Sequence, residues 1–490
     1  MGDATILTVW TPWVAFGFDF LLRAGLSVRI VMRRRPVGVS LAWLTLILIS
    51  PWVGAPIYLL FGELRLGRRR ARRAEAIHGA YIEWHHQLGQ CGPVDWKAVG
   101  VDYESMARMT AVAAGVPAHC GNALDLLPGA HAALTSLIEE IDRAKVACHL
   151  EFYIWNDGGR ADDVANALLR AAARGVDCSV LVDAVGSRSF LEGAMARRLR
   201  DGDVAVRAAL PVSMMRALFV RFDLRLHRKI AIIDNSVAYT GSLNLVDPRF
   251  FKREADVGEW VDAMVRVRGP AVGALTAIFL EDWELDTGEG LDAQSATPTQ
   301  LLGSAAGDAI VQVIPSGPQV GREGVVPAVL LLAIYRARHE LVLTTPYFVP
   351  DEVLLTALSS AALRGVAVTL IVPERVDSKL VRHASNACLG DLAEAGVRVL
   401  FFEGGLLHTK SVTVDEELSL IGTLNLDPRS FYLNFEITLA VYDRTFSRSL
   451  RALQQTYVDQ SRSMDLDVWN ARSGLARFAD NAARLLSPLL

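Results

Sequence analysis

The feature of this sequence that most restricts its fold is a duplicated motif. LHRKIAIIDNSVAYTGSLNL begins at Leu226 and LHTKSVTVDEELSLIGTLNL at Leu407, 181 positions later. Upstream of each copy lie a helix-forming stretch, an Arg-Gly pair and a run of strand formers, ALLRAAARGVDCSVLVD and ALSSAALRGVAVTLIVP. Gly175 and Gly365 stand where a helix ends and a positive φ is needed. We therefore predict an α/β protein built from two copies of one domain.

Each half contains a further apolar run that predicts a buried strand, LEFYIW from Leu150 and LVLTTPYFV from Leu341. Duplicated domains usually pack about a pseudo-twofold axis, so a site at their seam would receive one motif from each half. The predicted division is a membrane anchor (1–62), a basic arm and connector (63–120), a first domain (121–290), a linker (291–308), a second domain (309–460) and a C-terminal helical tail (461–490).

Each motif has the spacing His-x-Lys-x₄-Asp, which predicts six catalytic residues: His227, Lys229, Asp234, His408, Lys410 and Asp415. In a strand, residues i and i+2 point to the same face, so each His and its Lys are expected to project together into the seam. Only six of the 50 basic residues are lysines, and two of those six occupy the matched motif positions. A compact ammonium group is therefore expected there rather than a guanidinium.

Two histidines that face one phosphodiester can divide a transfer reaction between them. A neutral His attacks phosphorus, and a protonated His donates to the departing alkoxide. Each imidazole needs a partner that fixes its tautomer, and a carboxylate follows each motif, Asp262 in the first half and Glu436 in the second. We predict that these carboxylates orient the histidines. For Asp234 and Asp415, capping of the turn after each strand is the alternative to a catalytic role.

Both motifs continue into Gly-Ser/Thr-x-Asn. With the two lysines, the hydroxyl and amide groups would form a cradle for a tetrahedral phosphoryl group, so four residues are predicted to bind substrate: Ser242, Asn244, Thr423 and Asn425. A metal centre is a weaker interpretation, because lysine repels a cation and no His/Cys cluster has ligand spacing. No cofactor is expected.

The N-terminal region predicts a membrane anchor. Residues 37–62 run for 26 positions without a charge, more than the roughly 20 that a membrane-spanning helix needs. We predict one transmembrane helix over 38–61, kinked by its prolines, and a weaker one over 6–26. Within the weaker span Asp19 and Arg23 lie four residues apart and are expected to pair. An interfacial helix is the alternative for that segment.

Charge is distributed unevenly along the chain. Residues 1–75 carry a net charge of +7, and the whole chain carries −4, which leaves −11 for the remainder. A basic arm suits anionic lipid headgroups, whereas an acidic body is a poor match for nucleic acid.

The five cysteines are odd in number, scattered and without a Cys-x-x-Cys pair. We therefore expect free thiols and a body on the cytoplasmic side.

These motifs resemble the phospholipase D superfamily, and the whole chain is similar to its bacterial cardiolipin synthases. Further matching segments are GELRLGRRRA, GNALDLL, LEFYIW, TPYFVPDE, GTLNLDPRS and NFEITLAVYD. The resemblance implies two phospholipase D-like domains and a metal-free reaction in which two phosphatidylglycerol molecules give cardiolipin and glycerol through a phosphatidyl-histidine. By analogy His227 is the nucleophile and His408 the acid/base, an assignment that could be reversed. Thr423 stands where Ser is common, which keeps the hydroxyl.

The main alternative is a membrane-bound phospholipase D that hydrolyses phospholipid to phosphatidic acid, because exclusion of water depends on the shape of the pocket. A lipid-binding scaffold without turnover is disfavoured by the two intact motifs. The expected partners are phosphatidylglycerol and a bilayer with anionic lipids, without nucleic acid. Homo-oligomerisation, acyl preference and phosphatidylethanolamine as donor stay open. The expected location is the bacterial inner membrane, multi-pass, with the catalytic domains cytoplasmic.

Overall fold

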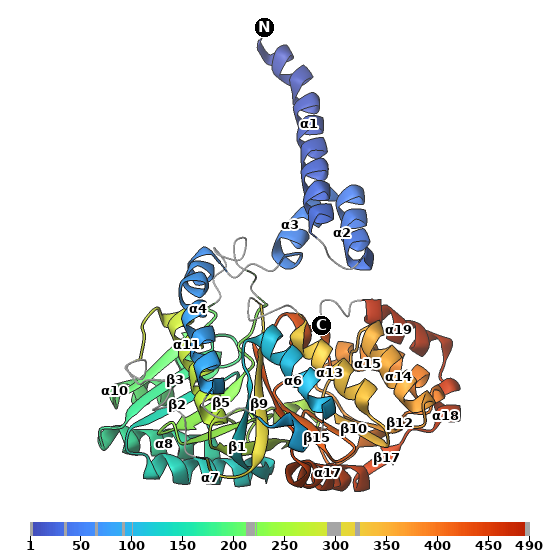
Figure 1. Ribbon diagram of the computed structural model, residues 1–490. Helices are drawn as coiled ribbons and strands as arrows, with labels where there is room; N and C mark the ends of the chain where they lie inside the picture. Colours follow the sequence, from blue (N-terminus) through green and yellow to red (C-terminus); the bar gives the residue numbers. More distant parts are fainter. Residues whose placement is uncertain are drawn as a thin grey trace. The chain divides into compact units, whose positions relative to one another are not determined.

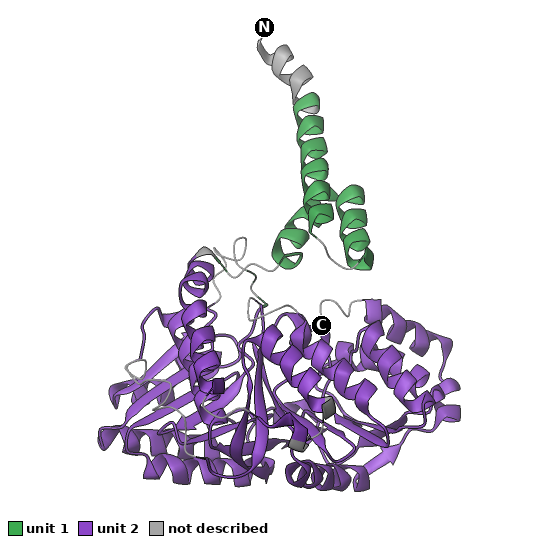
Figure 2. Cartoon of the chain, viewed as in Figure 1, with its two compact units in different colours: residues 1–68, 212–223 green, residues 69–211, 224–490 purple. Residues whose placement is uncertain are grey.

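The computed structural model describes residues 3–33, 37–63, 67–90, 94–99, 101–211, 221, 223–291, 305–318 and 324–485. The chain forms two compact units, residues 1–68 with 212–223 and residues 69–211 with 224–490 (Figure 2). Most of the predicted linker, 291–308, and Cys91 lie outside the described residues. None of the four described cysteines is in a disulfide, as predicted: Cys120, Cys148, Cys178 and Cys388.

The smaller unit contains the helices α1 (Asp3–Met32), α2 (Val37–Ile49) and α3 (Pro51–Phe61). A small apolar cluster packs these helices together, with Ile30, Ile47, Ala55 and Tyr58 at its centre. The buried Glu63 accepts hydrogen bonds from Arg29 at 2.7 Å and from the Tyr58 hydroxyl at 3.0 Å. As predicted, Arg23 pairs with Asp19, at 2.6 Å between Nε and Oδ2.

The predicted transmembrane helices are not supported. Among the residues that the structure describes, no helix is both long and apolar enough to cross a membrane. The span predicted over 38–61 is broken at Ser50, because Pro51 has no N–H to donate and its ring would collide with a carbonyl of the preceding turn. The two resulting helices have 13 and 11 residues, or about 20 and 17 Å, against a hydrocarbon core of roughly 30 Å. The span predicted over 6–26 lies within α1, whose sequence includes charged residues.

The larger unit begins with connector helices and continues with two halves of similar element order. The connector contains α4 (Arg68–Gln90), α5 (Trp96–Val99) and α6 (Val101–Ala114). The first half contains β1 (Ala118–Pro128), α7 (Gly129–Arg143), β2 (Ala147–Phe152), α8 (Arg160–Ala173), β3 (Asp177–Asp183), α9 (Arg188–Glu192), α10 (Ala194–Asp201), β4 (Val204–Ala209), β5 (Lys229–Ile233), β6 (Val237–Gly241), β7 (Trp260–Val261), β8 (Ala263–Arg268) and α11 (Ala271–Thr287).

The second half contains β9 (Ala309–Ser316), α13 (Val325–Arg336), β10 (Glu340–Thr344), α14 (Glu352–Leu363), β11 (Ala367–Pro373), α15 (Lys379–Glu394), β12 (Arg398–Phe402), β13 (Leu406–Leu407), β14 (Ser411–Val414), β15 (Leu418–Gly422), α16 (Pro428–Tyr432), β16 (Glu436–Val441) and α17 (Arg444–Asp459). It is followed by β17 (Ser461–Ser463), α18 (Leu466–Asn470) and α19 (Gly474–Leu485).

Fifteen of the described strands form one sheet, in the order β17-β12-β11-β10-β14-β15-β16-β9-β1-β8-β6-β5-β2-β3-β4. Reading outward from the antiparallel β9–β1 pair, the two halves give equivalent orders, since β8, β6, β5, β2, β3 and β4 match β16, β15, β14, β10, β11 and β12. This order confirms the predicted duplication of an α/β domain. The boundaries at 121–290 and 309–460 stay a proposal.

Helices cover both faces of the sheet (Figure 1). α7 and α8 lie below the first-half strands and α11 above them, whereas α17 lies below the second-half strands and α13 and α14 above. β2 and β10 contain the first residues of the two runs predicted as buried strands, and both are largely inaccessible. Gly175 and Gly365 follow α8 and α14 with φ of 84° and 90°, as their predicted positions at helix ends require.

Candidate active site

The two motif histidines lie where the halves exchange backbone hydrogen bonds. The N–H of His227 donates to the carbonyl of Phe435 at 2.9 Å, and the N–H of His408 donates to the carbonyl of Val261 at 2.8 Å. Beside His227, Leu226 and Phe435 form a parallel bridge. Beside His408, β7 and β13 pair as parallel strands. Each histidine is therefore fixed by the backbone of the other half.

The carboxylate that contacts each imidazole also comes from the opposite half. His227 Nδ1 lies 2.7 Å from Oε2 of Glu436, and His408 Nδ1 lies 2.7 Å from Oδ1 of Asp262. These are the contacts that an orienting role requires, since a carboxylate at Nδ1 fixes the tautomer of the ring. The order of residues along the chain did not indicate that the pairs would be crossed.

The hydroxyl groups of the Gly-Ser/Thr-x-Asn segments bind these carboxylates. Ser242 Oγ donates to Asp262 at 2.6 Å, and Thr423 Oγ1 donates to Glu436 at 2.5 Å. Asn434 donates to the second oxygen of Glu436 at 3.2 Å. Ser242 and Thr423 were predicted to bind substrate, whereas in the structure their hydroxyls hold the carboxylates that contact the histidines.

Both motif lysines are buried beside the histidines. Lys229 Nζ donates to the carbonyl of His227 at 2.8 Å, and Lys410 Nζ donates to the carbonyl of His408 at 2.6 Å. Burial lowers the pKa of Lys229 to about 8 and lowers the pKa of Lys410 well below its usual value. An ammonium group has three donors, so each lysine keeps capacity for an anionic substrate.

Both imidazoles are neutral at pH 7. Burial lowers the pKa of His227 and of His408 to about 4, although their carboxylate partners act in the opposite direction. Burial works against ionisation of Asp262 and Glu436, but contacts with the histidines and lysines outweigh it and lower the pKa of both. The two carboxylates in turn raise the pKa of Lys229 and of Lys410 against the effect of burial.

The two asparagines that were predicted to bind substrate differ in their contacts. Asn244 Oδ1 accepts a hydrogen bond from the N–H of Ile154 at 3.2 Å, and its Nδ2 has no partner in the described part of the chain. A hydrogen bond from the Asn425 side chain counteracts the effect of burial on the pKa of Asp427. A buried amide donor without a protein partner is suited to a substrate oxygen.

Two aromatic residues beside the histidines were not predicted. The ring centroid of Tyr153 lies 4.9 Å from that of His227, and the centroid of Trp260 lies 4.3 Å from that of His408. Their signals in the sequence were their places in LEFYIW and two positions before Asp262. Each ring therefore packs against a motif imidazole.

Asp234 and Asp415 lie apart from the histidines. Each follows the far end of its strand, five residues or about 16 Å along the strand from the motif lysine. Their carboxylates accept backbone N–H groups at 2.7–3.2 Å, from Lys145, Val146 and Ala147 for Asp234 and from Arg338, His339 and Glu340 for Asp415. Each carboxylate thus holds the backbone at the start of the neighbouring strand, β2 or β10, and the catalytic role of Asp234 and Asp415 stays a prediction.

Known proteins with similar sequences match nearly the whole chain. The family described as "Cardiolipin synthase, PLD-like domain" matches residues 137–283 and 330–456, and the family described as "Phospholipase_D-nuclease N-terminal" matches residues 24–63. The chain belongs to the cardiolipin synthases of the phospholipase D superfamily. It is 43% identical over 486 residues to cardiolipin synthase A of Erwinia tasmaniensis, which covers 99% of this chain and 100% of the relative.

The cardiolipin synthase A of Proteus mirabilis is 42% identical over 98% of both chains. A phosphatidylserine synthase from Haemophilus influenzae has a similar fold, with a TM-score of 0.57 and 16% identity over 79% of this cardiolipin synthase and 100% of that chain.

Proposed function

We propose that this cardiolipin synthase transfers a phosphatidyl group between two phosphatidylglycerol molecules and releases glycerol. The pair of buried imidazoles supports this proposal most directly, because each is bonded at 2.7 Å to a carboxylate of the opposite half. Two such groups suit a reaction whose two steps move a proton in opposite directions.

In the first step, Nε2 of His227 attacks phosphorus, a P–N bond forms and the P–O bond to glycerol breaks. His408 protonates the departing alkoxide, which leaves as glycerol. The negative charge of the bound phosphodiester raises the proton affinity of a buried histidine, so His408 holds a proton in the complex. In the second step, a hydroxyl of another phosphatidylglycerol attacks phosphorus, His408 takes its proton, and the P–N bond breaks. Two phosphatidylglycerols give one cardiolipin and one glycerol, without a cofactor.

Lys229 and Lys410 would bind the phosphate oxygens, and the amides of Asn244 and Asn425 would add neutral donors. Two ammonium groups suit this role because charge on the phosphoryl oxygens shifts during the transfer. Ser242 and Thr423 would act on the carboxylates rather than on the lipid.

The enzyme would act at a bacterial membrane surface. Its proposed substrate is a lipid with an anionic headgroup, and the N-terminal 75 residues carry a net charge of +7.

Incubation of the detergent-solubilised chain with phosphatidylglycerol alone tests the function. Cardiolipin and glycerol are expected in equal amounts, and both should be lost in His227→Ala and His408→Ala. Phosphatidic acid as the main product would instead establish a hydrolase, and absence of turnover would leave a lipid-binding scaffold. A parallel incubation with added phosphatidylethanolamine identifies the donor.

A further inference from the structure

A buried ion pair lies beside His227, at the start of β5, and in the described part of the chain it has no counterpart beside His408. Arg228 is 2% exposed, its Nη1 bonds Asp282 of α11, and its Nε donates to the carbonyl of Glu436 at 3.1 Å. In the second half Thr409 takes the same motif position, and its hydroxyl lies 3.1 Å from that of Tyr457 on α17. A charged contact in one half thus corresponds to a neutral one in the other.

The same asymmetry appears on the neighbouring strand. Glu151 of β2 is paired with Ile230, and Thr344 of β10 is paired with Ser411, so the two residues hold equivalent positions. Burial raises the pKa of Glu151 well above its usual value, and the nearby Asp282 adds to the shift. Burial therefore disfavours the charged form of Glu151.

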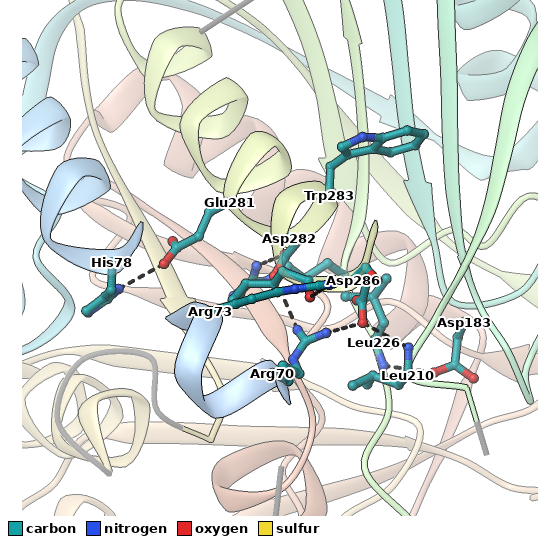
Figure 3. A network of polar contacts seen from close by, with 12 residues as sticks. Arg70, Arg73, His78, Asp183, Leu210, Leu226, Glu281, Asp282, Trp283 and Asp286 are labelled. Carbon is teal, nitrogen blue, oxygen red and sulfur yellow. Dashed lines mark hydrogen bonds and ion pairs between the residues drawn. The ribbon is translucent and has the colours of Figure 1, made fainter. Parts of the chain in front are cut away.

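A second buried arginine, on the connector helix α4, contacts the same part of α11. Arg70 is 9% exposed, bonds Asp286 through Nη1 and lies 4.0 Å from Asp282 through Nη2 (Figure 3). The two guanidinium groups of Arg70 and Arg228 thus face the carboxylates of Asp282 and Asp286. Without Arg70, Arg228 would be the only one of the two arginines left to balance the charges of Asp282 and Asp286.

The cluster of Arg70, Arg228, Asp282 and Asp286 adjoins the two residues of the second half that contact His227. The carbonyl of Phe435 accepts the N–H of His227, and the carboxylate of Glu436 contacts its imidazole. The guanidinium carbons of Arg70 and Arg228 lie 5.0 and 5.9 Å from the ring centroid of Phe435. Displacement of Arg228 would therefore move the two adjacent residues that fix this histidine.

We propose that Arg228 is a positioning residue for His227, acting through Glu436, and that Arg70 of α4 keeps Arg228 in place by balancing the charges of Asp282 and Asp286. This role depends on the proposed function of His227 in the transfer. It would make the reaction rate depend on Arg70 of α4, because a misplacement of about 1 Å can lower a rate about 100-fold.

Steady-state kinetics of the full chain with phosphatidylglycerol, beside thermal unfolding, test this role. We expect kcat to fall about 10- to 100-fold in Arg228→Met and about 10-fold in Arg70→Met. Arg228→Lys should lose less than Arg228→Met because it keeps a charge opposite Asp282. KM should stay within about twofold in all three, because neither arginine is assigned to the lipid.

Arg73→Met is the matched control. Arg73 also lies on α4, but it donates to the carbonyls of Leu285 and Asp286, at 3.1 and 3.4 Å, rather than to a carboxylate of the cluster (Figure 3). Its kcat should equal that of the wild type. An equal loss of kcat in Arg73→Met would overturn the proposal, since docking of α4 would then explain both results.

Arg70→Met/Asp286→Asn addresses the risk that the single variant does not fold. The double variant removes a cation together with its carboxylate, so Arg228 again faces one carboxylate and kcat should return to within about threefold of the wild type. Recovery of thermal stability without recovery of kcat would overturn the proposal. Wild-type synthesis of cardiolipin, lost in His227→Ala, tests the proposed function separately from any of these outcomes.

Discussion

Each motif histidine contacts a carboxylate of the opposite half, so a carboxylate variant should have the same catalytic defect as a variant of the histidine that it contacts. Glu436→Gln keeps the size of the side chain but removes the charge of a buried partner that lies 2.7 Å from His227. A hydrogen bond to a charged group contributes about 1.5–3 kcal/mol. At 1.36 kcal/mol for each tenfold change, its loss lowers kcat roughly 10- to 150-fold. Asp262→Asn should have a loss of similar size through His408.

A substrate that needs no general acid separates the two defects. In phosphatidyl-p-nitrophenol the leaving group departs without protonation, and its release is followed by absorbance. The nucleophile is still required, so His227→Ala stays inactive, whereas the first turnover of His408→Ala is rescued. The crossed pairs then predict that Asp262→Asn is rescued as His408→Ala is, and that Glu436→Gln is not.

The comparison does not depend on which histidine is the nucleophile, because each carboxylate variant is matched to the histidine that it contacts. A pattern in which Glu436→Gln follows His408→Ala would refute the crossed arrangement. So would kcat values for both carboxylate variants within threefold of the wild type.

Three further predictions concern stability and backbone geometry. His149 is buried against Phe279 and burial lowers its pKa to about 4, below the unfolded value of about 6.5, so its contribution to stability is present above pH 6.5 and lost as pH falls toward 4. Urea unfolding at pH 7 and pH 5 should show the wild type losing about 2 kcal/mol more than His149→Phe. Asp234→Ala should lower the free energy of unfolding by about 2–4 kcal/mol, measured by urea denaturation, while kcat stays within threefold, because its carboxylate accepts three backbone N–H groups far from the histidines. Gly258→Ala would place a Cβ 2.9 Å from the Cα of Gly405 and push β7 from β13, so kcat should fall about tenfold or more, whereas Gly175→Ala, whose Cβ meets no atom within 4 Å, should change stability without changing kcat.

The duplicated motif was sufficient to predict the α/β halves because helix, Gly and strand signals repeat in the same order. Gly175 and Gly365 marked the helix ends correctly. The side chains in the seam were harder to predict, since Asp262 and Glu436 are positioned by pairing between strands far apart in sequence. The hydroxyl of Ser242 was assigned to substrate because the position of Asp262 was unknown.

The N-terminal prediction failed for a different reason. Length and lack of charge favoured one helix over 38–61, and Pro51 was treated as a kink within it. In the structure Pro51 is the first residue of a new helix, where its missing N–H leaves no intrahelical hydrogen bond unmade. The spacing of Asp234 and Asp415 in the motif likewise did not indicate that each would follow the end of its strand that is farther from the motif histidine.

The crossed pairs also limit how the two halves can change over generations. A substitution at Asp262 alters the chemistry of His408, so selection on one half acts through a residue encoded in the other. Each motif histidine contacts the carboxylate of the opposite half, so a single half would have to associate with a second copy to complete either pair. A chimera that joins halves from distant relatives should therefore be active only when the carboxylates and histidines of its parents fit one another.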